Sequence, residues 1–233
     1  AVSSHLSVPN GMDPPVHTQY RRLIEPYFSY ERMADFAPTC RNITRQLVSP
    51  LASKGGIDFM SDFAENFALQ IQSAFMGWPE ELHQPLRLWI RKNQQATLAQ
   101  DRAAMKTIAL EFDGYIKELL STRREVSTDM PGDLTSQLLN ESVGNRPLND
   151  EEIVSILRNW TVGELATISA SVGILAHYLA KHVELQQQLR QTPALIPAAI
   201  DEILRIHAPL IANRRITTQP VIIAGRRLEA GEK

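Results

Sequence analysis

The chain has 233 residues, 43% hydrophobic and 21% charged, with a formal net charge of −2. This composition is typical of a soluble globular protein that can bury a substantial core, and the small net charge argues against a general nucleic-acid binder. The single cysteine, Cys40, excludes an internal disulfide and fits a reducing compartment. The first residues lack the basic stretch and apolar core of a signal peptide, so we expect a cytoplasmic protein.

Apolar residues that recur every three or four positions predict a mainly α-helical chain. Asp13-Pro14-Pro15 predicts a helix start with Asp13 as the cap, and the helix then runs from His17 to about Tyr27. The same pattern predicts further helices, in chain order, over residues 29–53, 58–76, 80–97, 102–124 and 134–141. Residues 125–132 are polar and predict a loop.

The second half of the sequence predicts a long helix, two shorter ones and a β segment. Residues 148–152 offer a capped start for the long helix, which runs to about His182. A short helix follows over 184–190, and Pro193 opens another. Only residues 215–229 alternate like a strand, with Gly225 at a turn. No repeat or linker divides the chain, so we expect one domain over residues 1–233.

The stretch from Trp160 to Leu179 is the nearest match to a membrane span. It carries Glu164, His177 and four serine or threonine residues. We therefore expect a helix that is buried in protein rather than in lipid, and no membrane association.

Glu202 and Arg205 lie three apart in an apolar helical stretch and so share one helix face. We expect them to be buried and paired, because two buried charges are tolerated only as partners. The alternative is an ordinary surface pair of little energetic value. Pro209 then stops the helix, and Arg215 heads the strand-like segment. This composite resembles the Glu-x-x-Arg helix and the following proline-to-arginine segment of the cytochromes P-450, the haem-thiolate monooxygenases.

A second resemblance lies in the first helix. Asp13-Pro-Pro-x-His17-x-x-x-Arg21 is similar to a stretch of that family whose histidine and arginine hydrogen-bond a haem propionate. Arg215 matches the third propionate-binding position. A propionate needs charge-assisted donors, and arginine offers them in a planar fork. Taken without the resemblance, His17 and Arg21 are ordinary solvated helix residues.

The long helix carries Gly163, and an interior glycine costs a helix about 1 kcal/mol relative to alanine. Such a glycine marks close packing or a functional approach. The family's central helix crosses the haem with the pattern Ala/Gly-Gly-x-Asp/Glu-Thr-Thr, whose acid and threonine deliver protons during dioxygen activation. This chain keeps the glycine and Thr167 but places Glu164 one residue early. Glu164 serves as that acid only if the helix is locally distorted; otherwise it is a partly solvated charge, and Gly163 a packing residue.

The resemblance implies a partial P-450 fold, mainly α, with a long central helix and a short C-terminal β segment. It also implies haem as cofactor and a small organic substrate. Electrons from NAD(P)H would arrive through a ferredoxin, a flavodoxin-type reductase or a fused reductase domain.

The haem-ligating cysteine is the feature that this chain lacks. The family places it well downstream of the Glu-x-x-Arg helix, and no cysteine follows Arg205. Cys40 lies on an apolar helix stripe, so we expect a buried free thiol rather than a haem ligand. The histidines show no metal-ligand spacing, and we assign no metal ligand.

We therefore expect an internal fragment that binds haem weakly or not at all and is inactive alone. We also expect it to self-associate through an exposed apolar surface. The alternative is a non-catalytic helical interaction protein of P-450 ancestry, or one chain of a split enzyme.

Overall fold

The computed structural model describes residues 7–125, 133–210, 212 and 215–232. The chain divides into two compact units, Ala1–Gly173 and Ile174–Lys233. Helices make up 72% of the structure and strands are few, which confirms the mainly α fold expected from the sequence. The loop expected at residues 125–132 lies outside the described residues, apart from Glu125.

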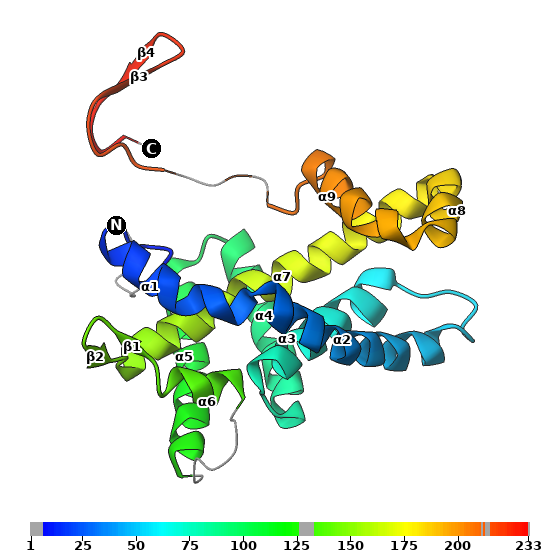
Figure 1. Ribbon diagram of the computed structural model, residues 1–233, viewed down its shortest axis with the longest axis horizontal. Helices are drawn as coiled ribbons and strands as arrows, with labels where there is room; N and C mark the ends of the chain where they lie inside the picture. Colours follow the sequence, from blue (N-terminus) through cyan, green and yellow to red (C-terminus); the bar gives the residue numbers. More distant parts are fainter. Residues whose placement is uncertain (1–6, 126–132, 211, 213–214, 233) are drawn as a thin grey trace. The chain divides into compact units, whose positions relative to one another are not determined.

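The first unit is built from helices and one small hairpin (Figure 1). Its α-helices are α1 (Val16–Ile24), α2 (Tyr30–Leu51), α3 (Glu65–Met76), α4 (His83–Leu98), α5 (Arg102–Glu125), α6 (Leu134–Leu138) and α7 (Asp150–Lys181), which continues into the second unit. Short 3₁₀ turns at Glu25–Phe28 and Glu80–Leu82 follow α1 and precede α4, and a π-helical turn at Phe59–Ala64 leads into α3. The antiparallel hairpin of β1 (Ser142–Val143) and β2 (Arg146–Pro147) was not predicted from the sequence.

The second unit contains the end of α7, α8 (Val183–Gln191), α9 (Ile196–Ile206) and a second hairpin. A 3₁₀ turn at Pro193–Leu195 precedes α9. The strands β3 (Val221–Ile223) and β4 (Arg226–Leu228) pair antiparallel. Gly225 lies between them with φ +81°, a backbone conformation that favours glycine. The turn at Gly225 is confirmed, and the predicted β segment is confirmed from Val221 to Leu228 but not over residues 215–220.

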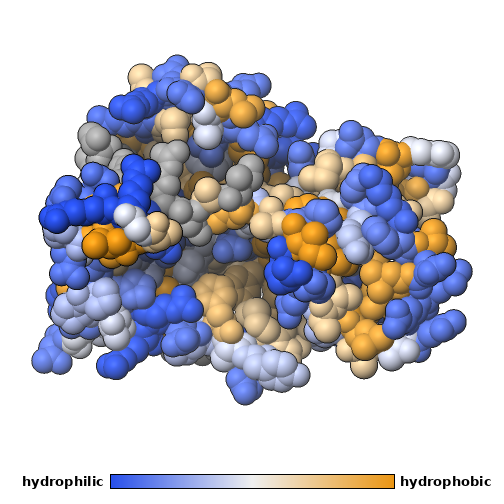
Figure 2. All heavy atoms as spheres, turned by 90° about the horizontal axis from the view of Figure 1, so that it is seen from above, coloured by the Kyte–Doolittle hydropathy of each residue, from blue (hydrophilic) through white to orange (hydrophobic). Residues whose placement is uncertain are grey.

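A groove of about 630 Å³ runs between the end of α7, α8 and α9. Its apolar walls include Leu175, Leu179, Leu189, Ile196, Ile200 and Ile203. Apolar side chains reach the surface around α8 and α9, where Figure 2 shows them in orange. Within this unit the apolar stripe of α9 is therefore only partly covered.

The two predicted helix caps have opposite outcomes. Asp13 does not cap α1: the cap position is Pro15, without a side-chain cap bond, and only the Asp13 carbonyl accepts a bond, from the His17 amide (3.0 Å). A cap at Asp13 would use the amide of the second or third residue after it, and Pro15 removes the first of these two donors. The start of α7 is capped as predicted. The Asn149 side chain accepts from the Glu152 amide (2.9 Å), and the Glu152 carboxylate accepts from the Asn149 amide (2.9 Å).

The core of the first unit surrounds the first half of α7 (Figure 1). Fully buried apolar side chains of α7 pack there with those of α3, α5 and α6, namely Ile153, Ile156, Leu157, Met76, Phe112 and Leu138. Beyond Leu165 most α7 side chains are half-buried or exposed, and only 11% of the most apolar stretch of the helix is buried. Trp160–Leu179 is therefore less buried than expected, with most of its residues half-buried, because the surrounding helices cover mainly the first half of α7. By length and composition alone α7 could cross a membrane, as many core helices of soluble proteins could.

Candidate functional site on α7 and α1

Gly163, Glu164 and Thr167 lie on neighbouring positions of one side of α7. A Cβ atom built on Gly163 would meet nothing within 4 Å, so this glycine is not a packing residue among the described residues. The Thr167 hydroxyl donates a hydrogen bond to the Gly163 carbonyl (2.8 Å) and lies 3.3 Å from that of Glu164. The structure thus places an open glycine directly beside a hydroxyl that retains its acceptor lone pairs.

Glu164 is exposed by surface area, yet desolvation by burial raises the pKa of its carboxyl above the ordinary value. The raised pKa therefore reflects neighbouring protein atoms crowding the carboxyl rather than full enclosure. A carboxyl that keeps its proton to higher pH suits a proton donor. However, α7 is helical throughout from Asp150 to Lys181, so the local distortion that would shift Glu164 into the acid position is not observed.

His17 and Arg21 are one turn apart on α1, the first half-buried and the second exposed. Neither side chain has a hydrogen bond or ion pair with any described residue. Two uncommitted donors on one helix face suit an anionic group, and a carboxylate above all. Arg215 belongs to the second unit, before β3, so its convergence with His17 and Arg21 stays a prediction.

Tyr20 anchors α1 to the start of α7 and was missed by sequence reasoning. Its hydroxyl donates to the Glu152 carboxylate, and both side chains are buried. Arg146 of β2 donates to the same carboxylate at 2.6 and 2.8 Å. Hydrogen bonds from Arg146 and then from Tyr20 lower the pKa of Glu152 to about 2. The helix that carries His17 and Arg21 is thereby tied to α7 by a buried charge.

The Glu202–Arg205 pair forms as predicted, with bonds of 2.7 and 2.8 Å between the guanidinium and both carboxylate oxygens. Its predicted burial is wrong, because the Glu202 and Arg205 side chains are 58% and 70% exposed. The two residues do share a face, but the apolar stripe of α9 that lines the groove lies on the opposite face. In this unit the pair is therefore a surface ion pair.

Cys40 lies half-buried on α2, and burial raises the pKa of its thiol more than Arg41 lowers it. A thiol that stays protonated is a poor metal ligand, because ligation requires the thiolate. Cys40 is therefore a free thiol as predicted, although it is half-buried rather than buried.

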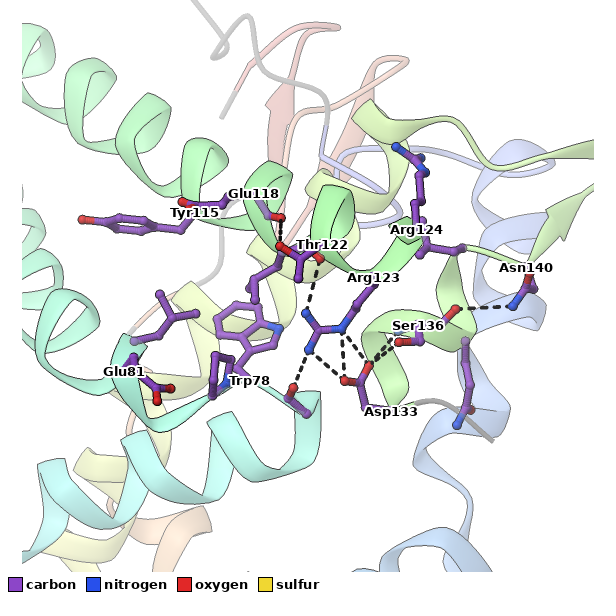
Figure 3. Close-up of a pocket in the computed structure, with 16 residues that line it drawn as sticks. Trp78, Glu81, Tyr115, Glu118, Thr122, Arg123, Arg124, Asp133, Ser136 and Asn140 are labelled. Carbon is purple, nitrogen blue, oxygen red and sulfur yellow. Dashed lines mark hydrogen bonds and ion pairs between the residues drawn. The ribbon is translucent and has the colours of Figure 1, made fainter. Parts of the chain in front are cut away.

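A cavity of about 860 Å³ lies between the end of α3, α5 and α6 (Figure 3). Arg123 lines this cavity, but its guanidinium is already paired with Asp133 (2.7 Å) and donates to the Gly77 carbonyl. The neighbouring Arg124 is paired with Asp150. None of the site residues predicted from the sequence lines it. We interpret this cavity as a structural junction rather than as the functional site.

A smaller cavity of about 190 Å³ lies beside the Gly163–Thr167 stretch. It is lined by Val162, Leu165 and Ala166 of α7 and by Trp89 and Ile90 of α4. The lining also includes Glu65, Arg87 and Arg91. A mostly apolar wall with a few polar groups is typical of a site for a small organic molecule.

No protein-family model matches the chain. Cytochrome P-450 CYP107DY1 of Priestia megaterium is 30% identical over 97% of this chain and 55% of that protein. Vitamin D(3) 25-hydroxylase of Pseudonocardia autotrophica is 29% identical over 95% of this chain and 54% of that protein. Among solved structures, the bacillaene polyketide synthase cytochrome P-450 PksS of Bacillus subtilis superposes with a TM-score of 0.86. The two sequences are 25% identical, and the superposition covers 94% of this chain and 56% of that chain.

Helical content, superposition and relatives agree on one class, the haem-containing P-450 fold of bacteria. The curated relatives and solved neighbours are bacterial cytochromes P-450 that match about 95% of this chain, and the chain spans about half the length of these relatives. The cofactor of that family is haem.

Proposed function

We propose that this chain forms the haem-facing part of a monooxygenase that oxidises a small organic substrate. Haem, when bound, supplies the dioxygen chemistry of the family. The chain's own residues hold and orient that group: His17 and Arg21 donate to its carboxylates, joined by Arg215. On α7, Gly163 leaves room for the haem. Thr167 offers a hydroxyl there. Glu164 stands one residue before the position of the family's acid, and its raised pKa keeps a proton beside that position to higher pH.

The observation that carries the proposal is the uncommitted pair of donors on α1. A buried network built on Tyr20 fixes this helix to α7, yet His17 and Arg21 have no partner among the described residues. Holding two donors of this kind on an anchored helix favours an anionic ligand. The described residues fit the carboxylate end of haem. Cys40, as a half-buried thiol on α2, does not fit its axial position.

The finer assignments follow the relatives. One relative is named as a hydroxylase of vitamin D(3), and another, from Micromonospora griseorubida, as a hydroxylase and epoxidase of mycinamicin IV. By analogy we assign a small organic substrate here, along the apolar wall of α7 and α4. A ferredoxin, a flavodoxin-type reductase or a fused reductase domain would deliver the electrons. We place the protein in the cytoplasm, with both units in one haem-monooxygenase domain.

A titration with two forms of the cofactor tests the proposal. Ferric haem and its dimethyl ester, whose propionates are blocked, are added to the chain with imidazole as an external axial ligand. We expect haem to bind more tightly than the ester. Arg21→Gln should remove that preference, a loss of roughly 1.5–3 kcal/mol, or about ten- to a hundredfold in Kd. The matched control is Arg22→Gln, on the next position of α1, which should keep it. Equal binding of haem and ester by the unsubstituted chain would refute the carboxylate role.

The apolar groove of the second unit favours a second candidate function, association with another protein chain or copy. Ile196 and Ile200 are 41% and 37% exposed beside it, and Val183 is 57% exposed. Apolar surface of this kind promotes association. Self-association is expected of both candidates, so the haem and ester titration distinguishes them. An interaction protein should associate in sedimentation velocity over a concentration series and show no preference between haem and ester.

A further inference from the structure

Gln72 is a buried polar residue of α3 that the proposed function leaves unexplained. It is 5% exposed, and its side-chain amide donates a 2.7 Å hydrogen bond to the backbone carbonyl of Trp160 on α7. Burying an amide costs free energy unless it finds such a partner. The contact joins two helices that are 88 positions apart in the sequence.

The carbonyl of Trp160 begins the helical turn that carries Glu164. In an α-helix this carbonyl is the acceptor for the amide of Glu164, four residues later, and Gln72 uses its second lone pair. The indole of Trp160 is itself packed against Tyr27 and Phe28, with ring centroids 5.8 and 5.0 Å away. Trp160 is therefore fixed at both its backbone and its side chain.

Gly163 lies in the same turn and makes its backbone less rigid. Glycine loosens a helix because it has more backbone freedom than any other residue, and no atom would contact a Cβ at this position. On its other side, the Thr167 hydroxyl holds the Gly163 carbonyl at 2.8 Å. Side-chain hydrogen bonds therefore hold this turn at two carbonyls, that of Trp160 and that of Gly163 itself.

We propose that Gln72 is a positioning residue, which fixes the turn of α7 from Trp160 to Glu164 and so sets where the Glu164 carboxyl stands. Its importance for chemistry rests on the proposed function, since it matters only if this face of α7 meets the haem. The hydrogen bond and its local effect do not depend on haem. They are therefore tested on the chain without cofactor.

Gln72→Met keeps the length of the side chain and removes the donor. Gln70→Met is the matched control, because Gln70 lies on the same helix, half-buried, with no side-chain hydrogen bond to a described residue. Hydrogen exchange followed by NMR should show the Glu164 amide exchanging about tenfold faster in Gln72→Met, the loss expected for one hydrogen bond, and unchanged in the control. The NMR titration of the Glu164 carboxyl should move toward its ordinary value in Gln72→Met alone.

Faster exchange spread evenly over α3 and α7, or the same local change in both variants, would overturn the positioning role. If the Gln72→Met variant fails to fold, a measurement on the unsubstituted chain tests the hydrogen bond instead. Scalar coupling across the hydrogen bond, between the Gln72 side-chain nitrogen and the Trp160 carbonyl carbon, should be detectable. Its absence would remove the contact on which the inference stands. Failure of the proposed function is read separately, from the haem and ester titration.

Discussion

The hydroxyl of Tyr20 donates a hydrogen bond to the Glu152 carboxylate, which lies 132 positions away in the sequence. Glu152 also caps its own helix through the Asn149 amide (2.9 Å) and accepts two bonds from Arg146. One buried carboxylate therefore joins α1, β2 and the start of α7. Since α1 carries His17, this carboxylate orients the proposed haem donors.

The first prediction concerns the pH dependence of this network. The folded-state pKa of Glu152 is about 2, below its ordinary value of 4.5, so its contribution to stability is full above pH 4.5. That contribution is lost as the pH falls from 4.5 toward 2. We expect a fall of roughly 1–3 kcal/mol in the free energy of unfolding, allowing for solvent screening at the half-exposed Arg146. Glu152→Gln should lack this portion of the pH dependence in urea unfolding curves. Parallel curves for the two proteins between pH 5 and 2 would contradict the network's role.

Local signals in the sequence predicted the elements that depend on neighbours in the chain. The cap of α7 and the pairing of Glu202 with Arg205 involve residues three apart, and both are observed. The burial of that pair was wrong because helix spacing gives a shared face without saying which face the fold covers. The β1–β2 hairpin was missed because each strand has two residues, too few for an alternating pattern.

Contacts across the fold could not be predicted from the sequence. The partners of Tyr20 and of Gln72 lie on other helices, and no local pattern in the chain identifies them. The family resemblance predicted His17, Arg21 and the α7 stretch as site residues. Such residues form short motifs in the family's sequences even where their partners lie far away in the chain. It could not supply the shift in the pKa of Glu164, which depends on how surrounding atoms pack.

The second prediction compares alanine substitutions at two glycines, Gly163 and Gly77. Gly163→Ala should stabilise the chain without haem by about 0.5–1 kcal/mol, because the helix interior favours alanine and the site is open. The same methyl group should weaken haem binding, since it fills the space proposed for haem. Gly77→Ala should instead destabilise, because φ is +73° and the new Cβ would lie 2.1 Å from that of Asp133. Thermal unfolding and haem titration of both variants check this. Unchanged haem affinity in Gly163→Ala would show that haem does not bind beside this position.

The third prediction concerns Glu164. Burial raises the folded-state pKa of its carboxyl, so ionisation costs stability as the pH rises from the ordinary value through the folded-state value. Glu164→Gln removes this cost. The variant should therefore unfold at a higher temperature than the unsubstituted chain at pH 7, and the difference should shrink at low pH. Equal melting temperatures at pH 7 would indicate an ordinary solvated carboxyl.

The fourth prediction follows from the exposure of the α9 ion pair. Arg205→Leu should leave the midpoint of urea unfolding of the 233-residue chain nearly unchanged, because water solvates Glu202 when its partner is removed. Ile203→Ala, on the buried side of the same helix, should lower the midpoint clearly, since Ile203 is 3% exposed. A large loss of stability in Arg205→Leu would contradict this exposure and support the buried pair predicted from the sequence.

The most direct test of the account is the absorption spectrum of the haem-loaded chain after reduction and exposure to carbon monoxide. We assign the haem carboxylates to His17 and Arg21 and no axial thiolate to this chain, since Cys40 is a half-buried thiol on α2. We therefore expect a haem spectrum without the thiolate-type Soret band, identical in Cys40→Ser. A thiolate-type band in the unsubstituted chain that disappears in Cys40→Ser would contradict it.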